Sequence, residues 1–109
     1  MDANIFRQTT EKRVNECMGI LVQRGANYAS DKDFLENFKH SAVLLTDLGF
    51  GFHGGPITPE SFAIIMCLIK LQRWSNRLRE NKDPSDDWTD LINYVLLGEG
   101  CHKESASSV

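Results

Sequence analysis

The sequence has few of the residues on which the commoner catalytic and metal sites depend. Its 109 residues include three cysteines and three histidines, and their positions lack the spacing of a zinc site. No serine lies in a nucleophile-elbow motif, and no glycine-rich segment has the sequence of a Walker phosphate-binding loop. These absences exclude a zinc finger, a hydrolase of the nucleophile-elbow type and a Walker-type nucleotidase.

The cysteine count also argues against a disulfide framework. Cys17, Cys67 and Cys101 cannot all pair within one chain, and the first two lie among apolar residues of predicted helices, where a thiol serves as a small core side chain. Residues 1–4 lack the regions of a signal peptide, and the longest apolar run, residues 62–69, is too short to span a bilayer. We therefore expect a cytoplasmic protein without a membrane segment.

A strong positive charge is missing as well. Twelve basic and fifteen acidic residues give a formal net charge of −3. Non-specific binding to nucleic acid needs a basic face that displaces counterions, so this charge balance argues against nucleic acid as a partner. Hydrophobic residues make up 41% of the chain and charged residues 25%, which is typical of one soluble globular domain at this length.

Helical periodicity dominates the sequence, and no long segment alternates with the period of a strand. The predicted helices cover about residues 10–24, 30–48, 58–79 and 86–97. Ser30 or Asp31 is expected to cap the second, and Gly25 and Gly49 to end the first and the second. We expect an all-α fold, a compact antiparallel four-helix bundle over residues 1–98 with a flexible tail over 99–109. So small a bundle leaves apolar surface uncovered, which favours a homo-oligomer.

The third predicted helix organises the chain. Thr58 can cap its first free N–H groups, Pro59 fits the first helical position, and Glu60 lies near the positive end of the helix dipole. The apolar residues that follow cover more than one narrow stripe. We therefore expect this helix to be central and packed on several sides.

Basic residues of the third helix form the first candidate site. Lys70, Arg73 and Arg77 follow a spacing of three and four residues, which aligns them along the helix. The guanidinium group suits phosphate and the lysine ammonium is a compact charge, so Lys70 and Arg73 are candidate phosphate ligands. In the alternative interpretation, the cations are solvated or pair with aspartates.

Acidic residues of the fourth helix form the second candidate site. Asp87 and Asp90 share a helical face that Tyr94 continues, and two carboxylates at this spacing can hold Mg²⁺ bridged to a phosphate. Asp87 is also explained by favourable charge at a helix start. Asp90 lies a turn further in, where an ion pair with Lys70 or Arg73 competes with a ligand role.

A turn and a loop complete the candidates. Tyr28, in a predicted turn, can stack on a base or anchor the turn. Residues 49–54 match the dinucleotide-binding pattern G-x-G-x-x-G, but they follow a helix instead of a strand and lead into Pro56, so the match carries no weight. Phe50 and Phe52 of this loop are candidates for contact with a ligand or a neighbouring subunit.

A set of residues spread over about 20–98 has a further pattern. It consists of Ile57-Thr58-Pro59, Ala63, Met66, Lys70 and Arg73, then Asp87-Trp88-Thr89-Asp90-Leu91 and Tyr94, with Asn27-Tyr28 and Asn37-Phe38 upstream. The pattern resembles a family of small phage and prophage proteins of unassigned function. It is also similar to the nucleotide-modification-associated domain of phages and, more distantly, to the MazG-like all-α nucleoside triphosphate pyrophosphohydrolases.

This resemblance implies a helical, oligomeric protein with a nucleotide pocket between helices or subunits. In the MazG-like enzymes, acidic residues of two helices hold Mg²⁺ around the triphosphate. By position, Asp87 and Asp90 match the later acidic pair, and Asp33 and Glu36 have the spacing of the earlier one. Ser61 stands where the family leads us to expect an acid, so the implied carboxylate cage is smaller and nucleotide binding without turnover is favoured.

We therefore expect a phage-type protein that holds a phosphorylated nucleotide, including a cyclic or signalling nucleotide of a host defence system, in the host cytoplasm. The expected ligand-binding residues are Lys70, Arg73, Tyr28, Trp74, Asp90 and Tyr94, and the expected metal ligands are Asp87, Asp90 and Glu36. Two alternatives stay open. One is a Mg²⁺-dependent pyrophosphohydrolase, and the other is a protein-binding inhibitor of a host factor.

Overall fold

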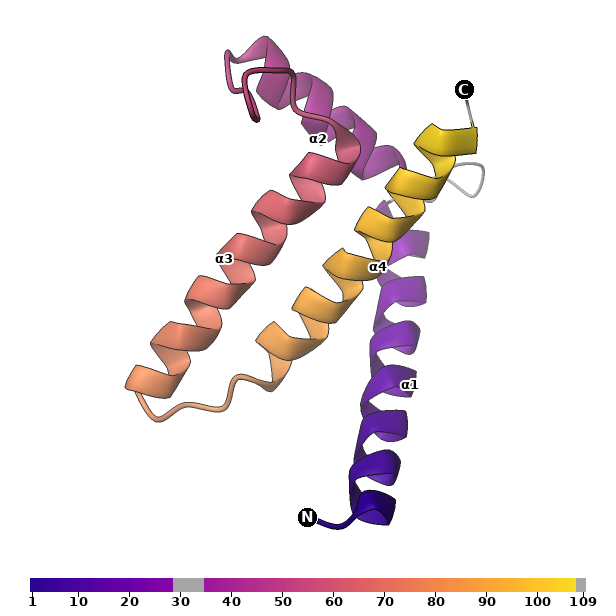
Figure 1. The fold of residues 1–109 in the computed structure, drawn as a ribbon, viewed down its shortest axis with the longest axis vertical. Helices are drawn as coiled ribbons and strands as arrows, with labels where there is room; N and C mark the ends of the chain where they lie inside the picture. The colour runs from indigo at the N-terminus through magenta and orange to yellow at the C-terminus, as the bar shows by residue number, and fades with distance from the viewer. Residues whose placement is uncertain (29–34, 108–109) are drawn as a thin grey trace.

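Four helices make up the protein in a computed structural model that describes the backbone of residues 1–28 and 35–107 and the side chains of 1–24 and 35–106. They are α1 (Ala3–Tyr28), α2 (Glu36–Asp47), α3 (Pro59–Arg79) and α4 (Ser85–Ser107) (Figure 1). Within these ranges the β-type pairing is a single isolated bridge, between Phe52 and Gly55. The predicted all-α fold of four packed helices is confirmed.

The predicted start of α3 is confirmed in detail. The Ser61 N–H donates to Thr58 Oγ1 at 3.0 Å, and the Thr58 N–H donates to Ser61 Oγ at 2.8 Å, with Pro59 in the first turn. These reciprocal bonds form a capping box with serine in the place of the usual glutamate. At the other end, Asn81 has a φ of +55° and the Lys82 N–H donates to the Arg77 carbonyl at 2.8 Å, a left-handed stop.

The end of α2 also lies where its glycine predicts. Gly49 has a φ of +95°, the Gly49 N–H donates to the Thr46 carbonyl and the Phe50 N–H donates to the Leu45 carbonyl, each at 3.0 Å. This is a Schellman arrangement, which glycine adopts without steric cost. The predicted caps of this helix, Ser30 and Asp31, lie outside the described residues.

The outer helices are longer than predicted, and the predicted stop of the first at Gly25 is wrong. α1 begins at Ala3, because the Ile5 N–H donates to Asp2 Oδ1 at 2.9 Å, and it continues through Gly25 to Tyr28. A glycine inside a helix costs about 1 kcal/mol relative to alanine, which does not suffice to end a helix of this length. Of the turn predicted over residues 27–30, the described part is helical.

The predicted end of the last helix near Leu97 is also wrong, because α4 continues to Ser107. Tertiary contacts explain the difference. Cys101 is buried, a Cβ added at Gly98 would lie 3.1 Å from the Ala63 Cβ, and Glu104 forms an ion pair with Lys39 of α2. Residues 99–107, predicted as part of a flexible tail, are therefore helical, and Cys101 and Glu104 fix this segment to the rest of the fold.

The central contact of the fold is the antiparallel pair α3 and α4 (Figure 1). α2 packs against α3, and α1 packs chiefly against α4. The core cluster consists of Phe38, Ala63 and Cys101, flanked by the half-buried Leu35, Phe62, Tyr94 and Leu97. Phe38 and Phe62 meet edge to face, with ring centroids 5.0 Å apart. One small core therefore joins α2, α3 and α4.

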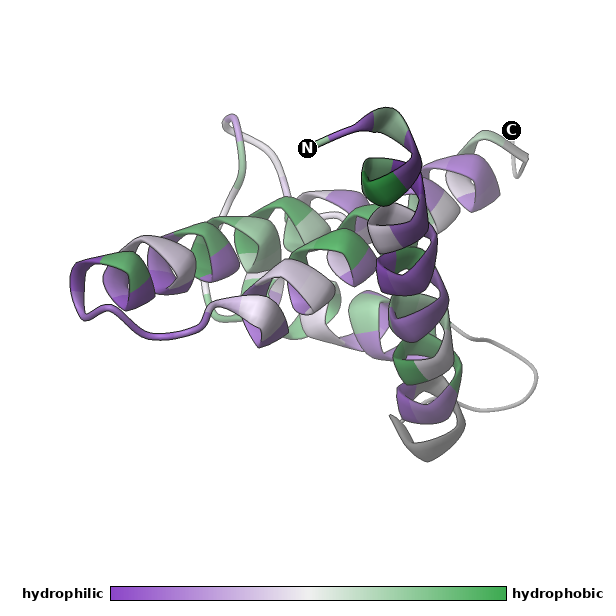
Figure 2. Cartoon of the chain, turned by 90° about the horizontal axis from the view of Figure 1, so that it is seen from below, coloured by the Kyte–Doolittle hydropathy of each residue, from purple (hydrophilic) through white to green (hydrophobic). Residues whose placement is uncertain are grey.

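The molecule is more open than a compact bundle, and the prediction of compactness is wrong. Its radius of gyration is 15.9 Å and its extents are 47 × 33 × 25 Å, whereas a compact chain of this length has a radius of about 13 Å. α1 leans away from α3 (Figure 1), and hydrophobic residues recur along all the helices (Figure 2). Large hydrophobic side chains are exposed on all four helices, for example Met18, Leu44, Leu68 and Val95. No helix of the described ranges combines the length and the apolar content that crossing a membrane requires.

Candidate functional site

Oppositely charged side chains of α1, α3 and α4 meet in a charged cluster, defined here as Arg24, Lys70, Arg77, Asp87 and Asp90. Lys70 Nζ lies 2.8 Å from Asp90 Oδ2, and Arg24 Nη1 lies 2.7 Å from Asp90 Oδ1. Arg77 Nε donates to Asp87 Oδ2 at 2.5 Å. Each aspartate is thus bonded to at least one cation, and the ion pair of Asp90 with Lys70, one of the two interpretations of Asp90, is present.

Three members of this cluster are largely withdrawn from solvent. The exposed fraction of Asp87 is 2% and that of Lys70 is 8%, and Asp90 is half-buried. A buried charge is tolerated when a partner and hydrogen bonds compensate the lost hydration. The pairs across α3 and α4 supply that compensation, which explains why Lys70 can lie on the inner side of α3.

The pKa of Asp90 reports the balance of these forces. Burial raises it by disfavouring the charged carboxylate, but the hydrogen bonds and charges of Lys70 and Arg24 together outweigh burial and hold the pKa below its ordinary value. Asp90 is therefore ionised at neutral pH. Its role in this arrangement is that of a fixed anion between two cations.

The predicted metal ligands do not gather into a metal site. Asp87 and Asp90 are engaged by cations, and Glu36 lies on α2, with its Oε1 4.0 Å from His40 Nε2. Across the described part of the chain, no group of three or more His, Cys, Asp or Glu side chains is arranged to hold a metal ion. The described residues therefore form no Mg²⁺ cage of the kind that the resemblance implies, and Asp33 of the implied earlier pair lies outside the described residues. We derive no metal-dependent step.

The other predicted ligand residues lie in different surroundings. Arg73 is exposed on α3, whereas the Trp74 ring packs edge to face on Trp88 with centroids 5.8 Å apart. Tyr94 lies 6.1 Å from Phe38, centroid to centroid, beside the core cluster. The side chain of Tyr28 lies outside the described residues. The two described aromatic rings among the predicted ligand residues, Trp74 and Tyr94, thus each lie against another ring of the protein.

Two arginines of α1 contribute contacts that the sequence interpretation missed. Arg13 donates to Thr89 Oγ1 at 3.1 Å and its guanidinium lies 5.8 Å from the centroid of the Trp88 ring, and Arg24 binds Asp90. A signal was present, because Arg13, Cys17 and Arg24 fall on one helical stripe and Cys17 is buried. Arginines that flank a buried residue in this way bring their charged groups to the helix interface.

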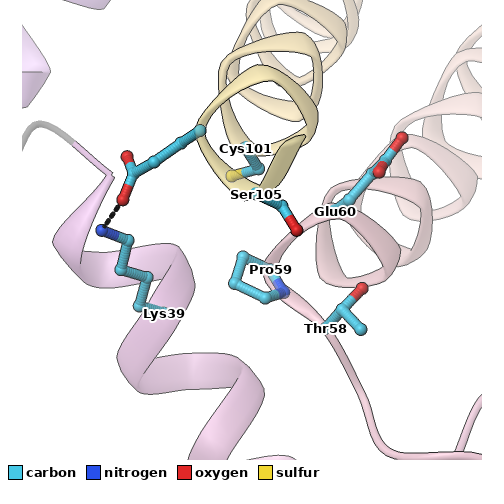
Figure 3. A pocket seen from close by; sticks show the side chains of 7 residues that line it. Lys39, Thr58, Pro59, Glu60, Cys101 and Ser105 are labelled. Carbon is cyan, nitrogen blue, oxygen red and sulfur yellow. Dashed lines mark hydrogen bonds and ion pairs between the residues drawn. The ribbon is translucent and has the colours of Figure 1, made fainter. Parts of the chain in front are cut away.

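Two pockets lined by described residues lie elsewhere. A groove of about 550 Å³ between α1 and α4 is lined by Arg13, Glu16, Gly19, Ile20, Gln23, Ser85, Asp86 and Thr89. A pocket of about 260 Å³ between α2, α3 and α4 is lined by Lys39, Thr58, Pro59, Glu60, Cys101, Glu104 and Ser105 (Figure 3). In Figure 3, Lys39 of α2 pairs with a carboxylate of α4 at one side of this pocket. Neither pocket includes Lys70, Arg73 or Asp90.

Buried polar atoms without a hydrogen-bond partner lie next to the charged cluster in sequence. Asn93 is 5% exposed, and neither atom of its carboxamide has a partner among the described residues; the same holds for Trp88 Nε1. A buried group left in this state costs about 1–3 kcal/mol. Asn93 lies one turn beyond Asp90 on α4. This part of the helix therefore contains buried polar atoms without a hydrogen-bond partner among the described residues.

Comparison with models of known protein families, with curated proteins and with solved structures found no match for this chain. The fold and the contacts therefore define the class of the molecule, an all-α protein of four packed helices with an internal charged cluster and uncovered apolar helix faces.

Proposed function

We propose that the protein acts by binding protein surfaces, its own copies among them, through apolar helix faces that its fold leaves uncovered. The observation that carries this proposal is the exposure of large hydrophobic side chains on every helix, in a chain whose radius exceeds that of a compact fold. Soluble monomers rarely expose extended apolar faces, and such faces mark interaction sites. Of the three interpretations of the sequence, this one corresponds to the protein-binding inhibitor.

One such face lies on α1 and is called the α1 face here. It consists of Val14, Met18 and Val22, which follow one another at intervals of four residues and are 47%, 57% and 59% exposed. α1 packs chiefly against α4 through its other side, where Cys17 is buried. A long helix that is held at one side and exposes apolar side chains on another suits the groove of a partner protein.

The charged cluster supports the same proposal indirectly. Lys70 and Asp90 form an ion pair inside the helix interface, and Arg24 of α1 also binds Asp90. These charges therefore stabilise the packing of α3, α4 and α1. Without these charges, a site for a phosphorylated ligand loses its strongest recognition elements. The exposed apolar side chains of the helices then remain as features that can carry a function.

Site-specific photo-crosslinking tests the α1 face. A photoreactive residue replaces Met18, on the face, or Lys12, an exposed position about 120° away around the same helix, in the full chain expressed in cells. The proposal predicts a discrete protein adduct at position 18. Unlabelled protein, added as a competitor, should reduce the amount of this adduct, and no adduct should form at position 12. No adduct at 18, or equal labelling at both positions, contradicts it.

We propose nucleotide binding as the second candidate function, on the specific support of Asn93. Its unpaired carboxamide one turn from Asp90 has the donor and acceptor that a base edge requires. In this version a phosphate group displaces Asp90 from Lys70, Arg73 turns inward to the same phosphate, and the pocket forms between helices or between subunits. The ligand class is a linear or cyclic phosphorylated nucleotide, bound without turnover.

A thermal-shift panel separates the two candidates. Linear and cyclic nucleotides, with and without Mg²⁺, leave the melting temperature unchanged if the protein-binding proposal holds. A nucleotide at 100 times its dissociation constant would instead stabilise the fold by about 2.7 kcal/mol. In that event Lys70→Ala and Arg73→Ala should abolish the shift with unchanged helical circular dichroism, whereas Lys82→Ala, at an exposed position, should preserve it.

A further inference from the structure

One exposed stripe of α3 has the spacing of a helix–helix seam. It consists of Ile64, Leu68, Leu71, Ser75 and Leu78, called the α3 seam here, whose successive intervals are four, three, four and three residues. All five are exposed, and the four hydrophobic members are 44%, 58%, 44% and 61% exposed in chain order. An apolar 4-3 repeat is the pattern by which one helix packs its side chains into another.

Within one chain the seam is left uncovered because α3 meets α4 with a different side. The inner contacts are Ala63 against Gly98, Lys70 with Asp90 and Arg77 with Asp87. The seam residues Ile64, Leu71 and Leu78 each follow one of these inner residues directly. Successive residues of a helix are rotated by about 100°, so the seam lies a quarter of the circumference or more away from α4.

We propose that the α3 seam binds the α3 seam of a second copy, with the two helices antiparallel and related by a two-fold axis between Leu68 and Leu71. This inference rests on the proposed function and names its first partner. In this register Leu68 of each copy meets Leu71 of the other, which gives a centre of four leucines, and Ile64 of one copy lies opposite Ser75 of the other. Such a dimer is closed and adds no further copies, because both copies use the same surface for the contact.

The charges at the ends of α3 favour the antiparallel direction. Glu60 lies in the first turn, and Arg79 in the last. Antiparallel pairing brings the acidic end of one copy beside the basic end of the other and aligns the helix dipoles favourably, whereas parallel pairing places like charges side by side. A standard interface buries about 800 Å² per partner, which is more than the seam side chains alone supply. In the proposed dimer, residues that flank the seam therefore join the contact. Because the interface is small, we expect the dimer to dissociate on dilution.

The first test is the mass in solution as a function of concentration. The wild-type mass should rise from 12.3 kDa towards twice that value, while Leu71→Asp, which places two carboxylates at the two-fold axis, should remain monomeric with unchanged circular dichroism. The matched control is Ile69→Asp, 42% exposed on the same helix but outside the seam, which should dimerise as the wild type does. Dimerisation of the Leu71→Asp variant, or an equal loss of dimer in the Leu71→Asp and Ile69→Asp variants, overturns the proposed seam.

Cysteine cross-linking tests the direction and register. In a Cys67→Ser background, which leaves the buried Cys17 and Cys101, Ile64→Cys and Ser75→Cys proteins should form a disulfide only when they are mixed. In the proposed register two copies of residue 64 are about 16 Å apart along the axis, at 1.5 Å per residue, too far for a disulfide. Cross-linking of Ile64→Cys with itself overturns the antiparallel pairing. A wild type that stays at 12.3 kDa overturns self-association, while photo-adducts at Met18 would independently uphold protein binding.

Discussion

Lys70 shows how one residue can be interpreted in two ways until its neighbours are known. Its position on α3 predicts either a phosphate ligand or an ion-pair partner, and the structure places its ammonium 2.8 Å from the Asp90 carboxylate. The sequence offered an ion pair of Asp90 with Lys70 as one interpretation, and this pair is present, whereas the ion pair of Asp87 with Arg77 was not specifically predicted. It could not say which cation meets which anion, because the relative rotation and offset of two packed helices depend on many side chains at once.

Replacing Asp90 by asparagine measures this pairing. Asp90→Asn leaves Lys70 without its anion inside the helix interface, and we expect a loss of about 2–3 kcal/mol in the free energy of unfolding at pH 7. The measurement is urea denaturation followed by circular dichroism. Glu11→Gln, at an exposed position of α1, should change the free energy by less than about 0.5 kcal/mol. A loss of similar size in both variants would contradict the assigned role of Asp90.

The same residue makes a prediction about pH. The pKa of Asp90 is lower in the folded protein than its ordinary value, so the folded state favours the ionised carboxylate. Its contribution to stability is present above the unfolded pKa of about 3.9 and is lost as pH falls through the lower, folded pKa. Between pH 7 and pH 3, wild type should lose more stability than Asp90→Asn. Equal losses would show that Asp90 does not titrate as described.

At the scale of the helices, local sequence signals predicted the start of α3 and the end of α2 correctly, because tertiary contacts do not override those signals. The capping residues Thr58 and Pro59 and the stop at Gly49 are all used as their chemistry predicts. The ends of α1 and α4 were misjudged for a physical reason. Gly98 has a poor local helix propensity, but its lack of a Cβ allows α4 to pass close to Ala63, and this contact extends the helix beyond what propensity predicts.

Two glycines in helices should respond in opposite directions to substitution. Gly98→Leu puts a side chain into space already filled by Ala63 and should cost about 1–3 kcal/mol. Gly19→Ala adds a methyl group at a position of α1 with no neighbour within 4 Å and should stabilise by about 0.5–1 kcal/mol. Thermal unfolding of both variants checks the pair. A stabilised Gly98→Leu protein would show that α4 does not approach α3 as closely as described.

The cap of α3 provides a further test at this scale. Thr58→Ala removes the acceptor for the Ser61 N–H and should cost about 1 kcal/mol. Thr58→Ser retains a hydroxyl and should retain most of the stability. Because α3 is the helix against which α2 and α4 pack, the loss should appear in the unfolding of the whole chain. Unfolding of a local segment alone, with the rest of the chain unaffected, would indicate that α3 is not central to the fold.

At the scale of the whole molecule, the helix content was predictable and the openness was not. Periodicity assigns residues to helix faces, but it does not state how many of those faces find a partner within one chain. Here Leu68, Leu71 and Leu78 have the character of core residues and are exposed, and few of the described hydrophobic residues are buried. The amount of uncovered apolar surface, on which the proposal of protein binding rests, follows from the tertiary arrangement and not from periodicity.

The account rests on the claim that the apolar faces of this chain are covered by protein. Sedimentation equilibrium of the purified wild-type chain over a wide range of concentrations tests this most directly. We predict a mass that rises from 12.3 kDa towards its double and does not respond to added nucleotides. A mass of 12.3 kDa at every concentration, together with stabilisation by a nucleotide, would contradict the account.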